Sequence, residues 1–159
     1  MSELSIESNG RIEKTAVYLN GEQVRGIKEL FINMDENGTF DAIMQYEGYD
    51  NEIHTKRIFH DQLTALQYSA PAFTEEESKH LQLLQIDSDG YIENTNVGFN
   101  GQMLDGLVSL FIHIRSATAP ERGILDMFSG KKYESSESIF KTEFVFRNQD
   151  DSISREAIF

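Results

Sequence analysis

The sequence predicts an all-β protein with a minor α-helical part: two tandem, similar antiparallel β-meander repeats that form a sandwich or barrel-like unit, joined by a short helical connector. Internal repetition is the first observation behind this prediction. When Leu4–Ile32 is set over Leu84–Ile112, an offset of 80 residues, 14 of the 29 positions are identical without a gap. Repetition on this scale indicates a tandem duplication. The second observation is the recurrence of Asn-Gly and Asp-Gly pairs, which favour the two-residue type I′ turns of β-hairpins.

The segments between these turns have the lengths of strands. In the first repeat the strands are predicted at 3–8, 11–19, 23–34, 39–47 and 53–59. In the second repeat they are predicted at 84–88, 91–99, 103–114, 123–128 and 139–147. Alternation supports them, because Leu30, Ile32 and Met34 recur with the period of two that places side chains on one face of a strand. The C-terminal segment 153–159 predicts one further strand.

Gly26 and Gly106 interrupt the long third strand at equivalent positions of the two repeats. Glycine inside a strand usually marks a bulge or a sharp bend. We therefore expect this strand to bend at both glycines and to pass from one sheet to the other.

The organisation along the chain is a β repeat at 1–60, a connector at 61–83 and a second β repeat at 84–159. In the connector, Thr74 and Glu77 have the spacing of a capping box, which predicts a short helix at 75–83. An earlier helical turn at 61–68 is also compatible with the sequence. The second repeat carries loop insertions at 116–120 and 129–138, and long loops on a repeated scaffold are where function tends to reside.

Composition limits the classes of partner. The chain has 159 residues with 27 acidic against 14 basic side chains, a net charge of −13. Such a field repels nucleic acid and anionic membranes and favours basic partners. Cysteine is absent, which excludes disulfides and thiolate chemistry and suits a reducing cytoplasm. Without a membrane-spanning apolar run or a secretory signal, we expect a cytoplasmic protein.

One stretch of the second repeat matches part of the sequence pattern of a calcium-binding loop. With Gly90 at the sixth position, Asp87 and Asp89 occupy two ligand positions. The first position, however, is Gln85, and the twelfth, which requires a bidentate Glu, is Asn96. The stretch is therefore interpreted as a hairpin turn, and no metal site is predicted.

Other tests for chemistry are also negative. The four histidines are not spaced as metal-binding pairs, and the sequence contains neither a phosphate-binding loop nor a GxSxG motif. The basic residues are scattered, whereas nucleic-acid binding requires a basic face. We expect no enzymatic activity, no cofactor and no direct contact with nucleic acid or membrane.

The segment Val17–Ile32 combines an Asn-Gly hairpin, a glycine soon after it and a long strand. This combination resembles a pattern in small β-rich proteins of bacteriophages and related mobile elements. The resemblance implies a virion component or a small accessory protein that binds a host factor. A phage-encoded protein of this kind would act in the cytoplasm of the host cell.

Together these observations predict a non-enzymatic, acidic binding protein. We expect an inhibitor that occupies a basic, nucleic-acid-binding partner, as phage anti-defence (anti-CRISPR-like) and immunity proteins do. Two linked copies can raise the effective concentration against a symmetric target. The candidate partner-binding residues are acids near turns: Glu13, Asp35, Glu36, Asp41, Asp87, Asp89 and Glu93.

Two alternatives remain open from the sequence. A duplicated β module could be a phage virion or other structural subunit that self-assembles into a ring. A cleft between the repeats could instead hold a small molecule such as a nucleotide. The aromatic residues considered for such a cleft are Tyr46, Tyr49, Phe128 and Tyr133.

Overall fold

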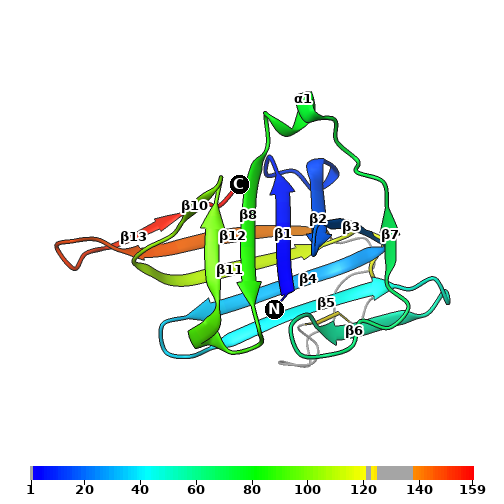
Figure 1. Ribbon diagram of the computed structural model, residues 1–159, viewed down its shortest axis with the longest axis horizontal. Helices are drawn as coiled ribbons and strands as arrows, with labels where there is room; N and C mark the ends of the chain where they lie inside the picture. Colours follow the sequence, from blue (N-terminus) through cyan, green and yellow to red (C-terminus); the bar gives the residue numbers. More distant parts are fainter. Residues whose placement is uncertain (1, 121–122, 125–137) are drawn as a thin grey trace.

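A computed structural model describes residues 2–120, 123–124 and 138–159 of the chain. It contains two antiparallel β-sheets of seven and six strands (Figure 1). The helices of the described part are α1 (Glu75–Ser78) and two 3₁₀ turns, η1 (Ile12–Lys14) and η2 (Ile92–Asn94). The all-β prediction is confirmed. None of the helices in the described residues has the length and hydropathy needed to cross a membrane.

The seven-stranded sheet has the order β10-β9-β8-β1-β2-β3-β7. Its strands are β1 (Ser2–Ser8), β2 (Thr15–Leu19), β3 (Glu22–Arg25), β7 (Gln67–Ser69), β8 (Gln82–Ser88), β9 (Asn96–Phe99) and β10 (Gln102–Met103). The six-stranded sheet has the order β13-β12-β11-β4-β5-β6. Its strands are β4 (Ile27–Asp35), β5 (Phe40–Glu47), β6 (Ile53–Arg57), β11 (Leu107–Arg115), β12 (Ile139–Arg147) and β13 (Ile153–Glu156).

The core lies between the two sheets. In Figure 1, β1 and β8 cross in front of the strands of the six-stranded sheet. One cluster of buried side chains joins the two layers, with Leu4 and Leu84 from the first sheet and Ile32 and Ile112 from the second. Met34, predicted to share a face with Ile32, is part of the same cluster. The predicted alternation in the central strands is therefore confirmed.

Each sheet takes strands from both halves of the chain. β1 pairs with β8, and Ser5 lies directly opposite Gln85. β4 pairs with β11, and Ile32 lies directly opposite Ile112. Positions 80 residues apart thus face one another in both sheets, as an approximate twofold axis through these two pairs would require.

The bends predicted at the two glycines are confirmed. Gly26 separates β3 in one sheet from β4 in the other, and Gly106 separates β10 from β11 in the same way. Their φ angles are +83° and +72°. The Gly26 carbonyl accepts a hydrogen bond from the Glu47 N–H, and the Gly106 carbonyl accepts one from the Arg147 N–H, both at 2.8 Å.

The turn prediction holds at two of the five Asn-Gly or Asp-Gly pairs. Both residues have positive φ at Asn20-Gly21 and at Asn100-Gly101, as a type I′ turn requires. At the other three pairs only the glycine does, so the type I′ prediction was wrong there. The reason is visible at Ser8, whose hydroxyl accepts the Gly10 N–H at 3.0 Å and bonds the Thr15 hydroxyl at 2.8 Å, closing a wider loop.

The connector contains less helix than predicted. The capping box is present, with the Glu77 N–H donating to the Thr74 hydroxyl at 3.1 Å. However, α1 ends at Ser78, because the chain becomes β8 from Gln82 onward. The compatible helical turn at 61–68 is absent, and β7 forms there as the edge strand next to β3. The strand predicted at 123–128 and the insertion at 129–138 lie mostly outside the described residues.

Candidate functional site: two related clefts

Two clefts open at the two ends of the central strands β4 and β11. One has a volume of about 390 Å³ and is called the acidic cleft. It is lined by residues including Met34, Asp35, Glu36, Ile92, Leu104, Asp105 and Val108. The other has a volume of about 480 Å³ and is called the Lys28 cleft. It is lined by residues including Ile12, Val24, Ile27, Lys28, Ile114, Ser116 and Ala117.

The two clefts are built from equivalent positions of the chain. Ile12 and Thr15 line one, and their counterparts Ile92 and Thr95 line the other. Each cleft is completed by the end of a central strand from the opposite half of the chain. The acidic cleft therefore contains Met34, and the Lys28 cleft contains its counterpart Ile114. The fold thus creates the same kind of opening twice.

The charges at equivalent positions have opposite signs or differ by one unit. Asp35 and Asp105 in the acidic cleft correspond to Arg115 and Arg25 in the other half. Glu36 corresponds to Ser116, and Val108 corresponds to Lys28. Of these counterparts, Ser116 and Lys28 line the Lys28 cleft, whereas Arg25 and Arg115 do not. The two clefts therefore differ in charge at two lining positions, Glu36 against Ser116 and Val108 against Lys28.

In the acidic cleft, two of the three carboxylates have partners within the protein. The Asp35 carboxylate accepts the N–H groups of Asn37 at 2.9 Å and Thr39 at 3.1 Å. Glu36 forms an ion pair with Arg147 at 2.6 Å. Asp105 is exposed at the rim. Asp105 is therefore the carboxylate best placed to meet a partner.

The structure distributes the predicted partner-binding acids over several places. Asp35 and Glu36 come together in the acidic cleft. Glu93 is exposed in η2 beside this cleft, whereas its counterpart Glu13 is exposed in η1 beside the Lys28 cleft. Asp41 lies on β5, Asp87 lies on β8, and Asp89 lies in the turn that follows β8. Sequence reasoning missed Asp105, although its pairing with Arg25 across the repeat was a signal that could have identified it.

Of the aromatic side chains considered for a ligand cleft, Tyr46 and Tyr49 line neither of the two clefts. Tyr46 is fully buried in the core, and its hydroxyl donates to the Thr64 carbonyl at 2.7 Å. Tyr49 is 73% exposed, away from the core. Phe128 and Tyr133 lie outside the described residues. The expectation of an aromatic cleft was therefore wrong for Tyr46.

Comparison with family models, with curated proteins and with solved structures found no match to this chain.

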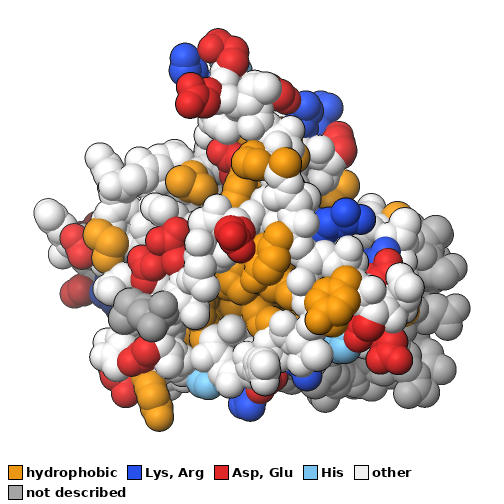
Figure 2. Space-filling view, turned by 45° about the vertical axis from the view of Figure 1, so that its right-hand side comes forward, with side chains coloured by type: hydrophobic (Ala, Val, Ile, Leu, Met, Phe, Trp, Pro, Cys, Tyr) orange, Lys and Arg blue, Asp and Glu red, His pale blue; other side chains and the backbone are white. Residues whose placement is uncertain are grey.

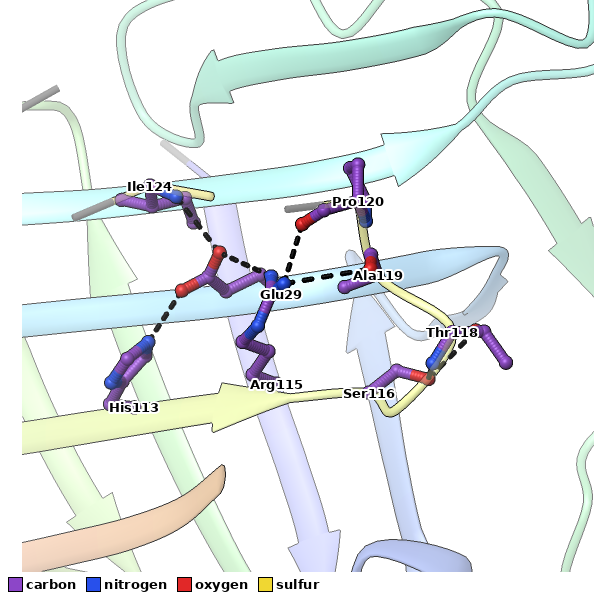
Figure 3. A network of polar contacts seen from close by, with 8 residues as sticks. All are labelled: Glu29, His113, Arg115, Ser116, Thr118, Ala119, Pro120 and Ile124. Atoms are coloured by element: carbon purple, nitrogen blue, oxygen red, sulfur yellow. Dashed lines mark hydrogen bonds and ion pairs between the residues drawn. The ribbon is translucent and has the colours of Figure 1, made fainter. Parts of the chain in front are cut away.

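A second notable feature is a buried charged network on the outer face of the six-stranded sheet (Figure 3). Glu29 and Arg115, which face each other across β4 and β11, are completely buried, and His113 is 3% exposed. One Glu29 oxygen contacts His113 Nε2 at 2.5 Å. The other accepts the Ile124 N–H at 2.8 Å and contacts Arg115 Nη1 at 3.4 Å.

This network anchors the chain that leaves β11. Arg115 Nη2 donates to the Pro120 carbonyl at 2.5 Å and contacts the Ala119 carbonyl at 3.5 Å. Glu29 also accepts the Ile124 N–H, so Ala119, Pro120 and Ile124 are all tied to this network. The spacing of the histidines gave no indication of this contact, because Glu29 is 84 residues away from His113 and becomes its partner only through strand register.

A third group, Asp50, Glu52 and His54, lies at the turn between β5 and β6. Their potential ligand atoms lie within 4.8 Å of one another. Asp50 already accepts the Glu52 N–H at 3.1 Å and contacts His54 Nε2 at 2.9 Å. Sequence reasoning missed this group, although the alternate spacing of the three residues along the chain was a signal that could have identified it. These contacts describe a turn stabilised by its own hydrogen bonds.

Hydrogen bonds at the turns also make stability depend on pH. The Thr39 N–H lowers the pKa of the Asp35 carboxyl below its ordinary value of 3.8, and the Tyr91 N–H does the same for Asp89. A carboxyl with a lowered folded-state pKa stabilises the protein above its unfolded pKa, and this contribution is lost as pH falls through the folded pKa. We expect the free energy of unfolding to fall below about pH 4. In the double variant Asp35→Asn, Asp89→Asn, the free energy of unfolding should decrease less steeply as pH falls. Urea titrations at a series of pH values measure this dependence. An unchanged slope would contradict this assignment.

Proposed function

We propose that the protein is a non-enzymatic binding protein whose acidic cleft receives a basic segment of a protein partner. The observation that carries this proposal is the acidic rim of Asp35, Glu36 and Asp105 around an apolar floor. Lysine and arginine have a similar division, since their stems are apolar and their ends are charged. A basic side chain can therefore lay its stem on the floor and place its cation at the rim.

The protein itself supplies a contact between a guanidinium and a carboxylate of this rim. Arg147 Nη2 lies 2.6 Å from Glu36 Oε1, and the Arg147 N–H bonds the Gly106 carbonyl, which is part of the same cleft. A guanidinium is thus already held at this rim. Met103 is 61% exposed on the neighbouring edge strand and adds an adaptable apolar contact for a partner.

The wider surface supports the same partner class. Figure 2 shows hydrophobic side chains gathered at the centre of one face, with acidic side chains and some basic ones around them. With a net charge of −13, the field favours encounter with basic proteins. We further propose that the protein inhibits its partner by occupying a nucleic-acid-binding surface, as a phage anti-defence or immunity protein does.

The test measures binding of a fluorescent arginine-rich peptide by anisotropy, with a glutamate-rich peptide as the probe of opposite charge. We expect saturable binding of the arginine-rich peptide that weakens as salt rises. Replacing Asp105 by lysine should weaken it by about fivefold, because the rim loses its most exposed carboxylate.

A matched control separates the cleft from the overall field. Glu75→Lys makes the same charge change at an exposed residue of α1 that lines neither cleft. Glu75→Lys should leave the affinity within about twofold. Equal weakening by both variants would show that net charge alone attracts the peptide, and absence of binding at low salt would reject the proposal.

A further inference from the structure

The Lys28 cleft has the composition of a ligand pocket. Its volume of about 480 Å³ lies within the range of about 300–1,000 Å³ that small-molecule sites occupy. Most of its lining is apolar, with Ile12, Val24, Ile27 and Ile114 among the lining side chains. A few polar groups also line it. In small-molecule sites the apolar lining usually holds the body of the ligand, and a few polar groups fix its orientation.

Lys28 gives this pocket a positive charge in a strongly acidic protein. Its Nζ lies 3.1 Å from the Thr118 hydroxyl. Among the described residues, no carboxylate forms an ion pair with it. An ammonium group offers three donors, so two remain for a bound anion.

Two hydroxyl groups lie beside Lys28: Ser116 lines the cleft, and Thr118, which does not, contacts the Lys28 ammonium. Thr118 and Ser116 share a hydrogen bond at 2.9 Å, and the Ser116 hydroxyl accepts the Thr118 N–H at 3.2 Å. When Ser116 donates to Thr118, the Thr118 hydroxyl hydrogen is available to a ligand oxygen. In the acidic cleft the counterparts of Ser116 and Lys28 are Glu36 and Val108, so this arrangement is specific to one end of the molecule.

We propose that the Lys28 cleft binds a small organic anion, a carboxylate carried on an apolar body. The apolar part packs between Ile12, Ile27 and Ile114, and the carboxylate meets Lys28 and the Thr118 hydroxyl. This site is independent of the acidic cleft, because it uses different residues and selects the opposite charge.

The experiment titrates the ¹³C-methyl-labelled protein with octanoate and with 1-octanol, the same chain without the charge. We expect saturable shifts of the Ile12, Ile27 and Ile114 methyl signals with octanoate. The Ile92 and Leu107 signals, in the acidic cleft, should not move and serve as the internal reference. Binding of 1-octanol should be at least about tenfold weaker, because it lacks the charge-assisted hydrogen bonds.

Three variants make the result decisive. Lys28→Gln should weaken octanoate binding about tenfold and leave 1-octanol unchanged. Ala117→Phe, an exposed rim position, should weaken both ligands by filling the cleft. Lys79→Gln, on the exposed C-cap of α1, should change neither. Equal affinity for the two ligands, unaltered octanoate affinity in Lys28→Gln, or absence of saturable binding at millimolar octanoate would overturn the proposal.

Discussion

Replacing Glu29 by alanine is expected to destabilise the protein by about 3–5 kcal/mol, the cost of removing one partner from a buried ion pair. Arg115 would keep its charge at a position with no solvent exposure, and the Ile124 N–H would lose its acceptor. His113 would lose the carboxylate that it contacts at 2.5 Å. Urea denaturation followed by circular dichroism measures the change in the free energy of unfolding.

The control for this prediction is a surface pair on the same sheet. Glu143 and Arg155 join β12 and β13 at 3.0 Å, with side chains 44% and 68% exposed. Because exposed ion pairs contribute little, Glu143→Ala should cost no more than about 1 kcal/mol. Glu29→Gln, which keeps the shape and one acceptor, should fall between the two alanine variants. Similar losses in Glu29→Ala and Glu143→Ala would show that the buried network contributes nothing beyond a surface pair.

Loss of Glu29 should also have a local signature. In the segment that follows β11, the described residues Ala119 and Pro120 are held by Arg115 and Ile124 is held by Glu29, which also contacts Arg115. Limited proteolysis of Glu29→Ala should therefore cut near this segment earlier than elsewhere.

Those parts of the fold that depend on local chemistry could be predicted from the sequence. The alternation around Ile32 and the recurrence of Gly26 at Gly106 indicated the core strands and the bends between the sheets. The short extent of α1 could not be predicted, because the competing strand pairing of β8 with β1 depends on residues 74 to 86 positions earlier. The turn after Ser8 was predicted wrongly because it also depends on a contact with a more distant residue. The Ser8 hydroxyl bonds the Thr15 hydroxyl, and a wider loop forms in place of the expected two-residue turn.

The sites were harder to predict than the strands. Asp35 and Glu36 were identified as acids near a turn, but the cleft that contains them also requires residues from the other half of the chain. Nothing in the sequence around Lys28 identified it as a site residue. Its significance comes from the comparison with Val108, which requires both the internal alignment and the knowledge that both positions line clefts. An internal repeat thus becomes most informative about function at the positions where its copies differ.

Replacing Gly26 by alanine is expected to destabilise the protein by about 3–5 kcal/mol. At φ +83° an added Cβ would lie 2.6 Å from the Glu47 carbonyl oxygen, which is backbone and cannot rotate away. Relief requires β4 and β5 to separate where the Glu47 N–H bonds the Gly26 carbonyl. The bend between the two sheets would lose both its backbone angle and its closing hydrogen bond. Thermal and urea unfolding measure the loss.

A graded set of glycines distinguishes the causes. Gly21 has a similar φ of +85°, but an added Cβ there would meet nothing within 4 Å. Gly21→Ala should therefore cost only the backbone strain, about 1–2 kcal/mol. Gly106→Ala, with the Arg147 carbonyl oxygen at 3.0 Å, should fall between the two. If all three variants lost the same stability, backbone angle alone would explain the glycines. The order Gly21, Gly106, Gly26 would instead show that close packing of one strand end against the next chain segment fixes the bend.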